Sequence, residues 1–167
     1  MRGKSLISMA FVFMLAASLA MVPVRAQDPT MYLNPPDPTA PPETFDVEVW
    51  IRDCPPVSGF EFKLWYEPSV LELSGVEPVV VEGDFLSQGG MYTTTFTVLR
   101  VLWAKYVEVS GVLTEEADPA PQGDGILCTI TFRLKAAGVT DLDFFDTFVL
   151  IYATGDRLDV AAEDGFF

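Results

Sequence analysis

The stretch from Ser58 to Leu73 reads SGFEFKLWYEPSVLEL, and it decides the fold of this chain. Apolar and polar residues alternate over its first half, which is the two-residue period of a β-strand with one face in a core. Pro68 cannot donate a backbone hydrogen bond, so the strand ends before it, and the bend returns residues 70–73 toward the same core. The stretch therefore predicts one strand and one corner of a β-sandwich. The residues predicted to face the core are Phe60, Phe62, Leu64, Tyr66, Val70, Leu71 and Leu73.

Similar alternation recurs along the rest of the chain. Strands are predicted over 45–51, 76–81, 91–101, 106–110, 128–134 and 142–151, and Pro55 and Pro56 end the first of these. Residues 83–90 are predicted to form a loop whose Phe85 and Leu86 plug the core. No convincing helical period follows residue 26, so the sequence predicts an all-β domain of about nine short strands in two packed sheets. The other aromatic residues predicted to be core packing are Phe96, Phe132, Phe144 and Phe148.

Three separated motifs resemble those of a cohesin domain. They are GFEFKLWYEPSVL at 59–71, GDFL at 83–86, and GILCTITF at 125–132 with Gly138 after it. They occur in the family's order, and the resemblance covers roughly residues 30–167. It implies a jelly-roll β-sandwich, a fold similar to that of a family of carbohydrate-binding modules. It also implies a non-catalytic binding module and leaves the ligand open.

The sequence divides into three segments. Residues 1–26 carry Arg2 and Lys4, then an apolar run and a small-residue ending at Ala26, which together predict a cleaved signal peptide and a secreted protein. A retained membrane anchor is the alternative. Residues 27–42 are a Pro-rich N-terminal segment with a short first strand at 31–33. The rest of this segment is either a flexible linker or an extended segment that crosses between the sheets, and the resemblance favours the second. Residues 43–167 are the cohesin-like β-sandwich domain.

The charge balance narrows the possible partners. The chain has 24 acidic and 10 basic residues, a net charge of −14, and three of the basic residues belong to the predicted signal. A surface this acidic repels nucleic acid and anionic lipid. The chain has no histidine, so it lacks the commonest general base and metal ligand. We therefore expect neither enzymatic activity nor a cofactor.

One acidic loop raises the question of calcium. Residues 114–125 include Glu115, Glu116, Asp118 and Asp124, and carboxylate oxygens are the ligands that Ca²⁺ prefers. Their spacing matches no known calcium-binding loop. We expect these side chains to be solvated, with a calcium site as the alternative.

The two cysteines, Cys54 and Cys128, are expected to form a disulfide in an exported chain. The cohesin-like order makes their strands antiparallel neighbours. The alternation places Cys54 in outward phase and Cys128 in inward phase, so the pairing requires a β-bulge near Asp53.

Several aromatic residues fall on strand faces that otherwise carry charge. Trp50, Trp65 and Tyr106 are of this kind, and the phase of Trp103 is ambiguous. Exposed rings serve both glycan stacking and protein interfaces, although shelter beneath a loop is the alternative for each ring. The resemblance implies a dockerin partner, bound by the strands at 59–66 and 106–110. That implied binding face contains Glu61, Lys63, Trp65, Tyr106 and Glu108.

Two other functions remain open at this point. A polysaccharide could stack on Trp65 and Tyr106 if these rings are coplanar on neighbouring strands. The domain could instead be a structural component of the cell surface. The sequence contains one copy of the motifs and no internal repeat, so the resemblance does not by itself imply assembly of a cellulosome.

Overall fold

The computed structural model describes residues 28–34, 43–74 and 78–166. The predicted signal peptide and residues 35–42 of the Pro-rich segment lie outside the described residues. Nearly all regular structure in the described part is β-strand, with one short helix, α1 (Asp84–Ser87), and one 3-10 turn, η1 (Leu102–Ala104). No helix in these residues is long and apolar enough to cross a membrane.

The first sheet has the order β11-β1-β2-β8-β4, and β5 also pairs with β8. All its pairs are antiparallel except β1 with β11. The short first strand of the Pro-rich segment is thus a paired part of the sheet. The strands are β1 (Thr30–Asn34), β2 (Thr44–Cys54), β4 (Leu71–Leu73), β5 (Val80–Glu82), β8 (Gly123–Leu134) and β11 (Ala161–Glu163).

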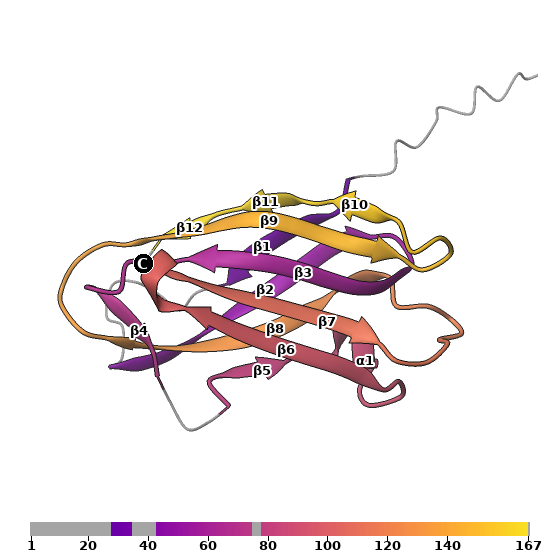
Figure 1. The fold of residues 1–167 in the computed structure, drawn as a ribbon, viewed down its shortest axis with the longest axis horizontal. Coiled ribbons are helices and arrows are strands. Elements are labelled where there is room, and N and C mark those ends of the chain that lie inside the picture. Colours follow the sequence, from indigo (N-terminus) through magenta and orange to yellow (C-terminus); the bar gives the residue numbers. More distant parts are fainter. Residues whose placement is uncertain (1–27, 35–42, 75–77, 167) are drawn as a thin grey trace, which may run out of the picture.

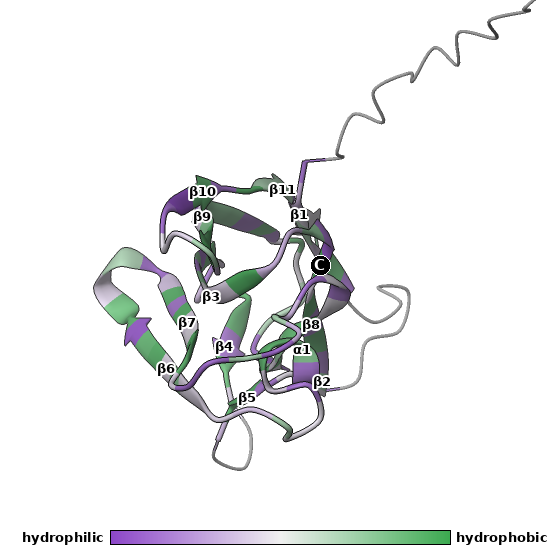
Figure 2. Ribbon diagram, turned by 90° about the vertical axis from the view of Figure 1, so that its right-hand side faces the viewer, coloured by the Kyte–Doolittle hydropathy of each residue, from purple (hydrophilic) through white to green (hydrophobic). Residues whose placement is uncertain are grey.

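The second sheet has the order β10-β9-β3-β7-β6, and β12 also pairs with β9. It is antiparallel throughout and lies in front of the first sheet in Figure 1. Figure 2 views the two layers after a quarter turn, with apolar segments on the strands of both. The strands are β3 (Val57–Trp65), β6 (Thr94–Val101), β7 (Tyr106–Leu113), β9 (Asp141–Ile151), β10 (Arg157–Asp159) and β12 (Gly165–Phe166).

The two-sheet sandwich is confirmed, and the strand count is corrected from about nine to twelve in the described residues. Five strands, β4, β5, β10, β11 and β12, are only two or three residues long. A period of two cannot be recognised over so few positions. Residues 76–77 of the predicted strand at 76–81 lie outside the described residues, and β5 is observed at its end. β8 begins at Gly123, within the predicted acidic loop.

The core forms where the inner faces of the two sheets meet. Phe60, Phe62, Leu64 and Tyr66 are each at most 2% exposed, so the inward face predicted for β3 is confirmed. Phe62 meets Phe144 of β9 edge to face at 5.5 Å between ring centroids, and Tyr66 meets Phe132 of the opposite sheet at 5.4 Å. Leu71 is fully buried, and Val70 and Leu73 pack against the cluster.

The inward position predicted for Phe148 is wrong. The pairing of β3 with β9 shifts register between Glu61 and Lys63, and Asp146 adopts a left-handed backbone with φ 50°. This β-bulge inserts a residue into β9 and reverses the alternation after it. Val149 is therefore fully buried, while Phe148 is only partly buried and lies under the Arg157 guanidinium at 4.1 Å.

The disulfide between Cys54 and Cys128 is also wrong, although the β-bulge predicted near Asp53 is present. Both cysteines are free and buried on the neighbouring strands β2 and β8. Cys128 lies opposite Val49, which is five residues before Cys54 on β2. Five residues of a strand span roughly 15 Å. A disulfide needs Cα atoms only about 5 to 6 Å apart.

We therefore expect two titratable thiols after denaturation without reductant. Burial raises the pKa of the Cys54 thiol to about 12 and raises that of Cys128 even further. Little reactive thiolate exists in the folded protein at neutral pH, so labelling by a thiol reagent should be slow until the chain unfolds. Fewer than two thiols in the denatured, unreduced protein would contradict the observed register.

The plug predicted at 83–90 is confirmed, but it is the single-turn helix α1 rather than a loop. Phe85 and Leu86 are 2% and 1% exposed, and they seal the sandwich beside β7 and β8. The Gly83 N–H donates to the Leu127 carbonyl at 2.9 Å, which holds this turn against β8. A side chain at position 83 would collide with the backbone carbonyl of Ile126.

Gly83→Ala should accordingly lower the free energy of unfolding by about 1 to 2 kcal/mol, in the range of overpacked sites. The matched control is Gly138→Ala, whose added methyl group would meet only the movable Val70 side chain at 3.2 Å. Denaturant melts of both variants measure the difference. Equal stability losses would show that the turn before α1 adjusts freely.

Candidate functional site

The five residues predicted for a binding face do lie together on one face of the second sheet. The antiparallel register of β3 and β7 places Trp65 opposite Tyr106, Lys63 opposite Glu108, and Glu61 opposite Ser110. Alternation explains this arrangement, because the residues between them on both strands are buried in the core. We call the outward surface of β9, β3, β7 and β6 the β3–β7 face.

The face also contains apolar residues that the sequence analysis did not assign to it. Phe145 of β9 is 38% exposed opposite Lys63, and Leu99 of β6 is 52% exposed opposite Glu108. Val112 of β7 is 40% exposed further along the strand. The sequence alone could have placed Phe145 on the outward face, because it follows inward-facing Phe144. The pairing of β3 with β9 was needed to place it beside Lys63.

The aromatic rings on this face are held by their neighbours. Tyr106 meets Phe145 edge to face, with 5.2 Å between centroids and 88° between planes. The Lys105 ammonium lies 6.0 Å from the Trp65 ring centroid and donates to Glu67 Oε2 at 2.8 Å. Trp65 is thus half-buried, and the Lys105 side chain over its ring holds the ring in position in the unbound protein.

One ion pair crosses the middle of the face. Lys63 Nζ donates to Asp146 Oδ2 at 2.6 Å and lies 5.9 Å from the Phe145 ring centroid. This hydrogen bond raises the pKa of Lys63 and lowers that of Asp146, so both groups are charged at neutral pH. Asp146 is exposed, so the pair contributes little to stability and serves to orient Lys63.

The carboxylates of this face outnumber its cations. Glu61, Glu108 and Asp143 form no ion pair with any residue that the structure describes, whereas Lys63 is engaged by Asp146. Burial, followed by the nearby charges of Asp164 and Asp141, raises the pKa of Asp143 above its ordinary value. The face therefore combines half-exposed rings with carboxylates that are free to meet positive charge.

The other aromatic candidates lie elsewhere. Trp50 is on the outer face of the first sheet, where it stacks on Tyr32 at 6.2 Å and donates to Glu48 Oε2 at 2.9 Å. Trp103 is 89% exposed in η1, between β6 and β7, and its neighbour Leu102 is 73% exposed. The sequence did not resolve the phase of Trp103, because η1 belongs to neither strand.

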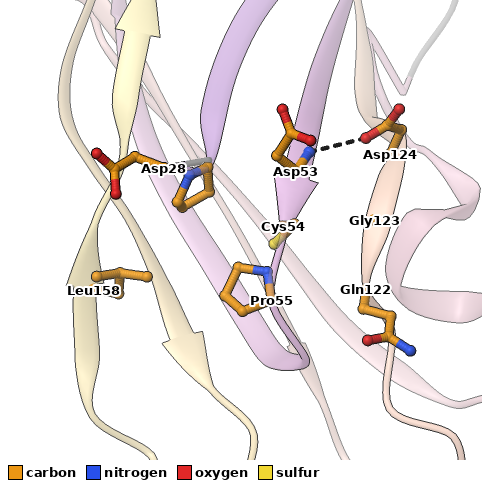
Figure 3. Close-up of a pocket in the computed structure, with 9 residues that line it drawn as sticks. Asp28, Asp53, Cys54, Pro55, Gln122, Gly123, Asp124 and Leu158 are labelled. Carbon is orange, nitrogen blue, oxygen red and sulfur yellow. Dashed lines mark hydrogen bonds between the residues drawn. The ribbon is translucent and has the colours of Figure 1, made fainter. Parts of the chain in front are cut away.

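Two of the four acidic residues of the predicted loop bond to separate partners. Glu115 accepts the Thr93 N–H at 2.6 Å, and Asp124 accepts the Asp53 N–H at 2.9 Å across the β2–β8 pair (Figure 3). Asp124 also lines a cavity of about 530 Å³ with Asp28, Cys54 and Leu158. Within the described residues, no group of three acidic or thiol side chains is arranged to hold a metal ion.

Calcium should accordingly change the stability of this protein very little. Millimolar CaCl₂ should shift the melting temperature no more than MgCl₂ at the same ionic strength. A specific site filled at a hundredfold excess over Kd would instead add about 2.7 kcal/mol. Differential scanning calorimetry with both salts separates these outcomes, and a calcium-selective rise would identify a site.

Comparisons with known proteins agree with the fold. The family model described as "Cohesin domain" matches residues 33–165. This chain belongs to the cohesin family. A non-cellulosomal cohesin from the archaeon Archaeoglobus fulgidus is 19% identical, with a TM-score of 0.60, 84% of this chain and 90% of that chain covered. No curated protein matches.

Two solved structures from Acetivibrio cellulolyticus are also similar to this cohesin. The second type II cohesin of the adaptor scaffoldin is 16% identical, with a TM-score of 0.71 and coverage of 84% and 90% of the two chains. The cohesin of a type II cohesin–X–dockerin complex is 15% identical, with a TM-score of 0.69 and coverage of 82% and 98%. At these identities the likeness establishes the fold alone.

Proposed function

We propose that this cohesin is a secreted, non-catalytic module that binds a dockerin-like protein through the β3–β7 face. The observation that carries the proposal is the grouping of Trp65, Tyr106 and Phe145 on one sheet surface with Glu61 and Glu108, carboxylates that form no ion pair with the described residues. Membership of the cohesin family supports it, because similar structures have been solved in complex with dockerins. The signal-like segment at 1–26 supports secretion.

The chemistry of the face defines the partner that fits it. Half-exposed rings at the centre of an interface exclude water and act as anchors, while surrounding charges select the partner and speed its approach. Glu61 and Glu108 lie on either side of Lys63 and remain available. The complementary surface is therefore apolar at its centre and carries Lys or Arg toward these two carboxylates.

Titration of purified dockerin modules against the chain from Gln27 onward tests this proposal. All described strands lie within 30–166, so this chain contains both sheets. In isothermal titration calorimetry, the variant Glu61→Arg with Glu108→Arg should weaken binding more than tenfold, because it reverses both available charges. Glu43→Arg is the control, since Glu43 is exposed just before β2. Binding that survives the double reversal would exclude this face.

The carbohydrate alternative places its platform on the same rings. Trp65 and Tyr106 do lie opposite each other, which that hypothesis required. However, Lys105 covers one face of Trp65, and Tyr106 stands nearly perpendicular to Phe145. Sugar rings stack on open aromatic faces, and both of these rings are already engaged by neighbouring side chains, so this geometry favours a protein partner. A glycan-array signal lost in Trp65→Ala, with no dockerin binding, would reverse the choice.

A further inference from the structure

β6 is the last strand of the second sheet in the described part of the chain. Among the described strands only β7 pairs with it, through eight consecutive residue pairs without a register shift. Natural edge strands are usually short, bulged, covered, or marked by charge or proline. β6 reads TTFTVLRV, with no proline, no acidic residue and a single charge at Arg100. Its outer row of backbone N–H and C=O groups is a template for another strand.

Exposed apolar side chains gather along this edge and just beyond both of its ends. Met91 precedes β6 and is 69% exposed, Leu99 within it is 52% exposed, and Leu102 and Trp103 after it are 73% and 89% exposed. These are four of the nine large apolar side chains that are exposed in the described part of the chain. Scattered single exposures are ordinary, but concentration along one edge marks an interaction surface.

The charge pattern identifies which partner can approach this edge. Residues 85–107 contain no acidic residue, although the chain has 24 in all. Two copies of a protein with net charge −14 repel each other over most of their surfaces. They can approach closely where carboxylates are fewest. Glu82 and Glu115 accept hydrogen bonds from Thr94 and Thr93 at the start of β6, and the strand itself contains no acidic residue.

We propose that this cohesin binds a second copy of itself by antiparallel pairing of β6 about a two-fold axis at Thr97. This axis places Phe96 opposite Val98 on the inner face and Thr95 opposite Leu99 on the outer face, favourable cross-strand pairs. No like charges face each other, because Arg100 of one copy lies opposite Thr94 of the other. Trp103 of each copy comes level with Met91 of the other, so the exposed ends of the edge cover each other.

This arrangement does not depend on the proposed function. An axis perpendicular to the sheet joins the two second sheets into one continuous sheet and keeps both β3–β7 faces on the same side. Two binding faces side by side would present a bivalent surface to any partner that carries two modules.

Sedimentation equilibrium of the chain from Gln27 onward tests the proposal. The mass should rise from monomer to dimer with protein concentration, and the dimer should strengthen at high salt because screening reduces repulsion between the copies. Thr97 is exposed, so Thr97→Glu should leave the fold intact while placing two carboxylates against each other at the axis. The dissociation constant should rise about tenfold or more.

Matched controls keep the result specific. Ala161→Glu adds the same charge to β11, the edge strand of the other sheet, and should not change the dissociation constant. The double variant Met91→Ser with Trp103→Ser should weaken the dimer, whereas Val139→Ser should not, since Val139 is 77% exposed in the connection between β8 and β9, outside the proposed pairing. Thermal melts verify folding. A monomer at every concentration and salt, or a dimer indifferent to both β6 variants, would overturn the proposal.

Discussion

Leu64→Ala should lower the free energy of unfolding by about 3 kcal/mol, the middle of the range for a buried leucine. Leu64 is fully buried near the end of β3, between Val107 of β7 and Phe144 of β9. Truncation removes its burial and leaves a cavity in the core, beneath a strand that is held by hydrogen bonds on both sides. The β3–β7 face should keep its side chains, because Leu64 points away from it.

Denaturant melts measure this effect, and the neighbouring Trp65→Ala is the control. Trp65 projects from the opposite side of the same strand and is only half-buried, so its truncation should cost the fold much less. If Trp65→Ala unfolded as readily as Leu64→Ala, the ring would be a structural element rather than part of a surface. The comparison separates packing from recognition at adjacent positions.

Trp65→Ala should instead weaken a dockerin-like partner by about 2 kcal/mol, roughly thirtyfold in Kd, as the loss of an aromatic anchor does. The reason lies in its surroundings. Trp65 is paired with Tyr106, and Lys105 lies over its ring while bonded to Glu67. Removal of the indole would take away both the contact area and the support that orients Lys105.

Titration calorimetry against the partner that binds the unaltered protein measures this loss. Trp50→Ala is a matched control, because Trp50 is also a half-buried tryptophan on an outer face, but on the other sheet. Trp50→Ala should remove the stacking contact with Tyr32 without changing the affinity for the dockerin-like partner. Equal losses from both tryptophan variants would place the binding surface somewhere other than the β3–β7 face.

Alternation along the sequence was enough to assign the inward and outward residues of strands that carry no bulge. In β3 and β7 the alternation correctly separated Phe62 and Val109 from Lys63 and Glu108. It did so because a strand's side-chain period is a local property of the backbone and needs no knowledge of its neighbours. The cohesin-like motifs added the order of the sheets, and together they located the candidate face.

Features that depend on how strands register with one another could not be read from the sequence and required the tertiary structure. The bulge at Asp146 moved Phe148 out of the core, and the pairing of Val49 with Cys128 separated the two cysteines. The short strands acquire their identity from β8, β9 and β1 rather than from their own sequences. Register and edge position are set by hydrogen bonds between segments far apart in the chain, so β6 became recognisable as a sheet edge only once β7 was found to be its one partner among the described strands.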